Sequence, residues 1–189
     1  VIPKAISTHK IYGFDFDGYW EDIGTIRSFY ETNLSLTDAD SPFDFHDPAQ
    51  PIYTRARFLP GSIIDGATLH SALVAEGVRI YRAEIRHSIV GLRGYVSNGV
   101  RMTDTIFMGA DYYDAPHRPP AGGVPLGIGP DCQIQGAILD KNVRIGAGVI
   151  IRPFPLGTEI DHEDWTVRDG IVVIPKNTTL CAGTVIGPE

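Results

Sequence analysis

The sequence predicts a mainly β chain built around a parallel β-helix, with a short strand–turn–helix segment before it. From about residue 64 onward, apolar residues recur every five to six positions, separated by small residues and turn formers. This spacing fits neither the 3.6-residue period of a helix nor the alternation of a hairpin meander. It fits short strands that turn corners around a three-sided prism, in which each coil stacks its inward side chains on the coil below. The 21 glycines and 14 prolines also favour many turns and little helix.

The segment 10–36 is expected to form a strand, a turn and a helix. Aromatic residues alternate with glycine and aspartate over 12–17, which predicts a strand, and a glycine-flanked turn follows at 18–25. Apolar residues at i, i+3, i+4 and i+8, starting from Ile26, predict a short amphipathic helix with Thr25 or Asp22 as its N-cap. A carboxylate at such a junction is well placed to meet a metal ion or a phosphate.

The segment 37–60 is rich in proline and aspartate, and we expect an extended linker that follows a surface. Its expected apolar anchors are Phe43, Phe45, Ile52, Tyr53 and Phe58.

An internal repeat carries the β-helix prediction. Residues 64–107 divide into four stretches of eleven, with a small residue at the third position and apolar residues expected inward at the fourth and sixth. The pattern returns over 129–150, where Cys132 takes an inward position, and becomes a spacing of six at Ile174, Leu180 and Ile186. The stretches 110–124 and 152–169 interrupt the repeat and are expected to be projecting loops, which often carry function.

Composition limits the classes of partner. The net charge of −7 argues against a general nucleic-acid binder and against an anionic membrane surface, so neither is expected as a partner. No apolar run approaches the roughly 18 residues of a membrane span. Two cysteines make no disulfide framework or zinc motif. Because the chain begins Val-Ile-Pro, we expect a fragment or processed product, cytoplasmic by default or plastidic in a plant.

Several blocks of the sequence resemble the ADP-glucose pyrophosphorylase (glucose-1-phosphate adenylyltransferase) family. They occur in the family's order and cover nearly the whole chain from about Ile11: GYWEDIGTIRSFYETNLSL, PIYTRARFLP, HSIVGLRGYVSNGVRMTDTIFMGADYY, GIGPDCQIQGAILDKNVRIG and RDGIVVIPKNTTLCAGTVI. The resemblance implies the family's C-terminal part: residues 1–36 as the edge of an α/β nucleotidyltransferase domain, 37–60 as a linker and 61–189 as a left-handed β-helix. At roughly eighteen residues a coil in that family, about five coils fit.

The resemblance also implies an activity for the parent protein. Enzymes of this family form ADP-glucose and pyrophosphate from ATP and glucose-1-phosphate, for glycogen and starch. Their glycine-rich nucleotide loop, a first metal-binding aspartate and most sugar-phosphate contacts belong to an N-terminal domain that these 189 residues do not contain. The chain alone is therefore expected to be inactive, with the missing catalytic domain, further copies of itself and a phosphorylated effector as partners.

Site residues follow from the same resemblance. Asp22 matches a carboxylate that helps bind Mg²⁺, and Trp20 matches a residue beside the sugar phosphate. Lys141, Lys176 and Arg168 match basic positions associated with the effector, since ammonium and guanidinium groups suit phosphate. The residues themselves leave plainer interpretations open: a helix cap for Asp22, an interface aromatic for Trp20 and solvated corner side chains for the bases.

Arg55 and Arg57, in the linker block, are expected to join such an effector pocket.

Three other functions compete. A hexapeptide-repeat acyltransferase would use a corner histidine as general base, and His70 and His87 both lie in the coils. That reading leaves the block GYWEDIGT unexplained. A non-catalytic regulatory subunit would bind effector without turnover. A pyrophosphorylase for another sugar would share the β-helix, but the MGADYY and DGIVVIPKN blocks do not match those families.

Overall fold

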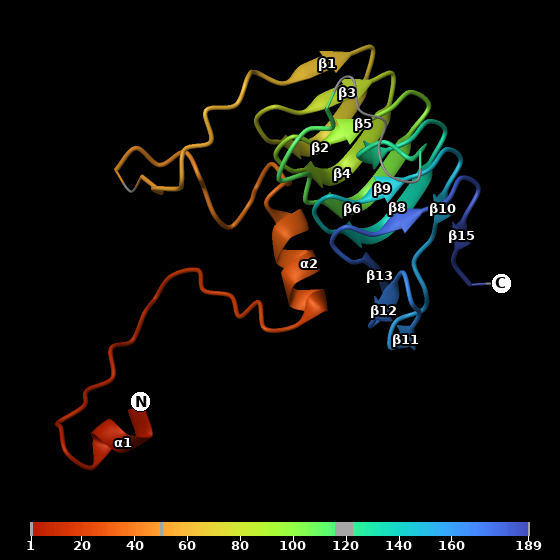
Figure 1. The fold of residues 1–189 in the computed structure, drawn as a ribbon. Coiled ribbons are helices and arrows are strands. Elements are labelled where there is room, and N and C mark those ends of the chain that lie inside the picture. Colours follow the sequence, from red (N-terminus) through yellow and green to blue (C-terminus); the bar gives the residue numbers. More distant parts are fainter. Residues whose placement is uncertain (1, 50, 116–122, 189) are drawn as a thin grey trace.

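The computed structural model describes residues 2–49, 51–115 and 123–188 (Figure 1). The helices are α1 (Ile2–Ile6) and α2 (Ile26–Ser35). The strands are β1 (Ile63–Asp65), β2 (Thr68–Val74), β3 (Arg79–Tyr81), β4 (Glu84–Val90), β5 (Tyr95–Val96), β6 (Arg101–Phe107), β7 (Gly127–Ile128), β8 (Gln133–Leu139), β9 (Arg144–Ile145), β10 (Ile150–Ile151), β11 (Ile160–Asp161), β12 (Thr166–Arg168), β13 (Ile171–Ile174), β14 (Thr179–Leu180) and β15 (Val185–Ile186).

Parallel strands build the three faces of a prism, which confirms the predicted β-helix. The first face is β1-β3-β5-β7-β9-β14. The strands β2, β4, β6 and β8 each bend over a corner, because their pairing skips the residue in the middle. Their first halves form the second face with β10 and β15, and their second halves form the third face with β13. The bending residues, which all have positive φ, are Ser71, His87, Asp104 and Gly136.

The core is a set of apolar columns inside the prism. Equivalent inward side chains of successive coils lie on one another, and they are almost completely buried. The columns contain Ile80, Val96, Ile128, Ile145 and Leu180 on the first face, Ile85, Met102, Ile134, Ile151 and Ile186 on the second, and Val90, Phe107, Leu139 and Ile174 on the third. Cys132 is buried with them, as expected. Each coil therefore depends on its neighbour for burial.

The eleven-residue division is wrong in its third stretch. Leu69 pairs with Ile85 and Ile85 with Met102, so the true steps are 16 and 17 residues. Ile89, expected inward, instead packs outside the third face, while Ser88, expected in a turn, is buried. Eleven residues cover only two of the three faces, whereas a full coil takes 16 or 17. A division into elevens therefore places equivalent residues of successive coils at different positions. Among the described residues, the first and second faces have six parallel strands each and the third has five, which agrees with about five coils.

Helix α2 forms as expected and covers the third face (Figure 1). Thr25, and not Asp22, is the N-cap: its side chain accepts a hydrogen bond from the Ser28 amide in a capping box. Leu34 is buried among Ile106, Ile138 and Ile171, and Phe29 and Tyr30 pack beside it. The strands of the third face carry apolar residues on both sides because one side faces the core and the other faces α2.

The strand expected at 12–17 does not form. All of residues 7–24 lie outside helices and strands, and Figure 1 shows this segment extending away from the coils. The side chain of Phe14 is 90% exposed. A strand needs a neighbouring edge to pair with, and nothing in the described residues provides one here.

The apolar residues expected to anchor the linker are also exposed. Tyr53 and Phe58 are 91% and 95% exposed, whereas Phe43 and Phe45 pack mainly on each other, edge to face, with ring centroids 5.1 Å apart. The linker therefore follows no surface of the described chain through these side chains.

The interruption at 152–169 is more ordered than the expected loop. Its strands β11 and β12 form an antiparallel hairpin that joins β13 and widens the third face. Trp165 stacks between Phe154 and His162, with ring centroids 6.3 and 4.8 Å away. Part of the other interruption, 116–122, lies outside the described residues.

Two glycines allow the cost of backbone strain to be compared with the cost of a steric clash. Gly109 and Gly148 both have positive φ, +79° and +66°. A Cβ at Gly109 would lie 2.2 Å from the Leu92 carbonyl oxygen, whereas one at Gly148 would have nothing within 4 Å.

We expect Gly148→Ala to lower the free energy of unfolding by about 1–2 kcal/mol, from backbone strain alone. Gly109→Ala should lower it by more than about 3 kcal/mol. Urea unfolding measures both, and equal losses would contradict this account.

Candidate functional site

Lys141 and Lys176 occupy equivalent positions at the corner where successive coils pass from the third face to the first. The backbone amide of Asn177 donates to the Lys141 carbonyl oxygen at 3.0 Å, which stacks the two corners directly. The lysine ammonium groups converge on one carboxylate, that of Asp111: Lys141 Nζ is 3.2 Å from Oδ1 and Lys176 Nζ is 2.6 Å from Oδ2. The structure thus brings together two of the predicted effector residues.

Two asparagines hold the Asp111 carboxylate in place. Asn142 Nδ2 donates to Asp111 Oδ2 at 3.2 Å and to Asn177 Oδ1 at 3.0 Å, while Asn142 Oδ1 accepts the Asp111 amide at 2.8 Å. Both asparagines have φ near +60°, a conformation that asparagine tolerates better than most residues. Asparagine therefore suits both the positive φ of the corner and the side-chain hydrogen bonds made there. The sequence analysis did not identify Asp111, although it lies in the MGADYY block.

The charges at this corner are strongly coupled. Hydrogen bonding to Lys176, helped by Lys141 and Asn142, lowers the pKa of Asp111 to about 2. Reciprocally, Asp111 raises the pKa of Lys176. Because all three charged side chains are partly exposed, solvent reaches the cluster. A phosphate placed here would meet the same two ammonium groups that now hold a carboxylate.

Arg168 lies apart from the lysines. It forms ion pairs with Asp161 and with Glu159, the latter at 3.6 Å, and donates to the Ile160 carbonyl at 3.1 Å. Hydrogen bonding to Asp161 raises the pKa of Arg168. Its bonds are thus made within the 152–169 hairpin region.

Arg55 and Arg57 are exposed in the linker, where Arg57 Nη1 donates to the Arg55 carbonyl at 2.5 Å. The structure does not bring either of them, or Arg168, to the lysine corner.

Asp22 and Trp20 stand in the extended N-terminal segment. Asp22 is exposed, and the Trp20 side chain is 73% exposed. Within the described ranges, no three His, Cys, Asp or Glu side chains form a group able to hold a metal ion. The residues present therefore do not make a Mg²⁺ site by themselves.

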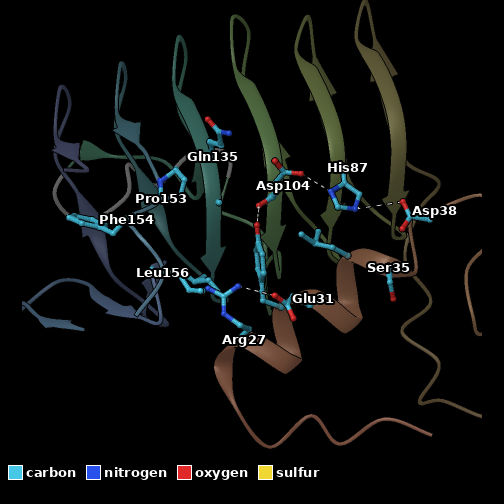
Figure 2. A pocket seen from close by; sticks show the side chains of 15 residues that line it. Arg27, Glu31, Ser35, Asp38, His87, Asp104, Gln135, Pro153, Phe154 and Leu156 are labelled. Carbon is cyan, nitrogen blue, oxygen red and sulfur yellow. Dashed lines mark hydrogen bonds and ion pairs between the residues drawn. The ribbon is translucent and has the colours of Figure 1, made fainter. Parts of the chain in front are cut away.

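A cleft of about 390 Å³ lies between α2 and the third face (Figure 2). Arg27 joins its two walls: it bonds the carboxylate and carbonyl oxygen of Asp169 and forms an ion pair with Glu31 at 2.8 Å. Tyr30 Oη donates to the Asp104 carbonyl at 2.5 Å. These contacts fix the helix on the sheet. The only sequence signal for them was the i, i+4 pair of Arg27 and Glu31.

His87 lies at one end of this cleft with carboxylates at both ring nitrogens (Figure 2). Its Nδ1 is 2.6 Å from Asp104 Oδ1, and its Nε2 is 3.7 Å from Asp38 Oδ1. A general base needs one nitrogen directed at its substrate. Through Nδ1, His87 joins two neighbouring coils, while its Nε2 faces the carboxylate of Asp38, just beyond α2, without hydrogen-bonding it.

Fold and site together define a parallel β-helix domain that presents paired lysines at a coil corner. Residues 57–185 match the family described as the GLGC left-handed parallel β-helix domain, and the chain belongs to this family. It is 40% identical over 192 residues to the glucose-1-phosphate adenylyltransferase large subunit 1, chloroplastic/amyloplastic, of Zea mays. That match covers 98% of this chain but only 37% of the relative, so the chain spans little more than a third of its relative's length. None of the described helices is long and apolar enough to cross a membrane.

The unequal effect of the two lysines on Asp111 is testable. Since the Lys176 bond is the largest single cause of the shift, Lys176→Met should raise the pKa of Asp111 from about 2 toward 3.8, and Lys141→Met should raise it less. Carboxyl ¹³C NMR titration measures both values. Because the folded pKa is below the unfolded one, the contact stabilises the fold above about pH 4 and is lost as pH falls through about 2. A larger effect of Lys141→Met would contradict the assignment.

Proposed function

We propose that this chain is the C-terminal regulatory and oligomerisation part of a glucose-1-phosphate adenylyltransferase. The parent protein would form ADP-glucose and pyrophosphate from ATP and glucose-1-phosphate in glycogen or starch synthesis. One observation carries the proposal: 98% of the chain matches the large subunit of such an enzyme at 40% identity. Membership of the GLGC β-helix family supports it.

The proposal divides the chain at residues 36 and 60. Residues 1–36 would complete a catalytic domain, 37–60 would link, and 61–189 would form the regulatory β-helix. The exposure of Tyr12, Phe14, Phe16 and Trp20 supports packing of the first segment against a domain outside this chain, because such an apolar surface usually has a partner. In that setting Asp22 would be one ligand of a Mg²⁺ ion and Trp20 would face the sugar phosphate. Mg²⁺ would supply neutralisation of phosphate charge when bound.

The regulatory role is assigned to the lysine corner. A phosphorylated metabolite would replace the Asp111 carboxylate between Lys141 and Lys176, since phosphate satisfies both ammonium groups at once. Arg168, Arg55 and Arg57 would contact only a larger effector, or one bound after the linker and hairpin rearrange.

The similarity to a glucose-1-phosphate adenylyltransferase subunit also supports a proposal about assembly with other chains. The relative is named a large subunit, which supports assembly with other subunits. The homo-oligomer expected for this chain stays a proposal. A non-catalytic regulatory subunit is the second candidate, favoured by the two lysines at a corner suited to an anion. The relative's name, chloroplastic/amyloplastic, supports a plastid location as the alternative to the cytoplasm.

Adenylyltransferase assays test the function. The 189-residue chain should form no ADP-glucose from ATP, Mg²⁺ and glucose-1-phosphate, whereas a longer protein that carries the catalytic domain before it should. Product from the chain alone would contradict the proposal. A longer protein that binds effector but makes no product would establish the regulatory-subunit alternative.

Binding of phosphate compounds tests the lysine corner. With inorganic phosphate and glucose-1-phosphate as probes, Lys141→Gln and Lys176→Gln should each weaken binding about tenfold, because each removes a charge-assisted bond. Asp111→Asn should tighten binding several-fold, since it removes the competing carboxylate. Lys10→Gln, at an exposed lysine in the N-terminal segment, is the control and should change nothing. Isothermal titration calorimetry gives the affinities, and weaker binding by Asp111→Asn would refute the competition.

A further inference from the structure

A second cationic pocket, of about 370 Å³, lies on the first face of the β-helix. Arg79 and Arg93 both lie near the ring of Tyr113, each with its Cζ 5.9 Å from the ring centroid. Tyr95, Pro125 and Leu126 complete an apolar wall. The pocket therefore combines two guanidinium groups with aromatic and apolar surface.

Neither arginine has a carboxylate partner among the described residues. The one carboxylate in the pocket wall, Asp114, is already neutralised: Arg144 binds both of its oxygens, at 2.6 and 2.9 Å, and the Leu126 amide donates to it at 2.8 Å. Hydrogen bonding to Arg144 lowers the pKa of Asp114. Two positive charges around one ring, without a counter-ion, favour an anion from solution.

The backbone holds the pocket in shape before any ligand arrives. Arg79 pairs with Tyr95 between strands β3 and β5. The Arg93 amide donates to the Glu76 carbonyl at 3.1 Å, and its Nη1 donates to the Ala110 carbonyl at 3.3 Å. The arginine positions therefore belong to the rigid coils.

Tyr113 is equally fixed. Its hydroxyl donates to the Gly77 carbonyl at 3.0 Å, and a Cβ at Gly77 would lie only 2.3 Å from that hydroxyl oxygen. Gly77 thus provides the space in which the tyrosine is seated. A pocket with fixed walls loses little conformational entropy when it binds.

We propose that this pocket binds a nucleotide, with its phosphate held by the Arg79 and Arg93 guanidinium groups and its base against the ring of Tyr95. The volume, 370 Å³, is within the usual range for small organic ligands and exceeds what a bare phosphate fills. The tyrosine ring offers a stacking surface that any base can use. This site is distinct from the lysine corner and does not rest on the function proposed for it.

Titration calorimetry of the 189-residue chain tests the site, with AMP and UMP as probes and with inorganic phosphate and adenosine as their fragments. Both nucleotides should bind more tightly than either fragment, because phosphate and base each make contacts. Arg79→Gln and Arg93→Gln should each weaken nucleotide binding about tenfold. Arg101→Gln removes the same charge at an exposed position of β6 and should leave binding unchanged.

A second variant shows which of the two sites binds the nucleotide. Lys176→Gln should leave nucleotide affinity unchanged, whereas a loss there, with Arg79→Gln unaffected, would place the nucleotide at the lysine corner and overturn the proposal. No binding of either nucleotide, or equal losses in Arg79→Gln and Arg101→Gln, would also overturn it. Circular dichroism shows whether each variant is folded. If Arg93→Gln is unfolded, because it loses the Nη1 bond to the Ala110 carbonyl, Arg79→Gln alone decides the result.

Discussion

Stacking of one coil on the next is the interaction on which the rest of this structure depends. Parallel pairing aligns equivalent positions of successive coils, 16 or 17 residues apart where no insertion intervenes and 32 or 35 apart across the two insertions. Buried apolar side chains therefore lie on one another along the core. The same alignment acts outside the core: corner residues that are far apart in sequence become neighbours. Lys141 and Lys176 meet for this reason, and so do His87 and Asp104.

The loop that begins at Ala110 places its side chains against corner residues of the coils, and these contacts form the two candidate binding sites. It runs along one corner of the prism, where Asp111 engages both lysines, Tyr113 lies against two arginines and Asp114 binds Arg144. One short segment thus contributes to both of the proposed anion-binding positions. Since its side chains are bonded to rigid coils, the loop is held by the scaffold, as functional loops commonly are.

Sequence patterns predicted most of the β-helix and little of its surface chemistry. The five- to six-residue spacing of apolar side chains reports directly on burial at each face, so the prism, the inward Cys132 and the amphipathic helix at 26–35 were predictable. The strand at 12–17 and the anchors of the linker were predicted wrongly, because alternation records only a tendency to pair. Whether a partner edge exists is decided elsewhere in the molecule. Asp111 was overlooked since nothing local distinguishes it from a solvated loop aspartate.

The sequence by itself determined the class of fold, the helix that covers it and the relationship to the adenylyltransferase family, because these depend on periodicity and on contiguous blocks of residues. Only the tertiary structure decided which charges meet. Asp111 joins lysines 30 and 65 positions away, and Tyr113 lies against both Arg79 and Arg93, through contacts set by coil registration. A one-dimensional pattern contains the period of a β-helix, but the alignment of its corners depends on the exact length of every turn and insertion.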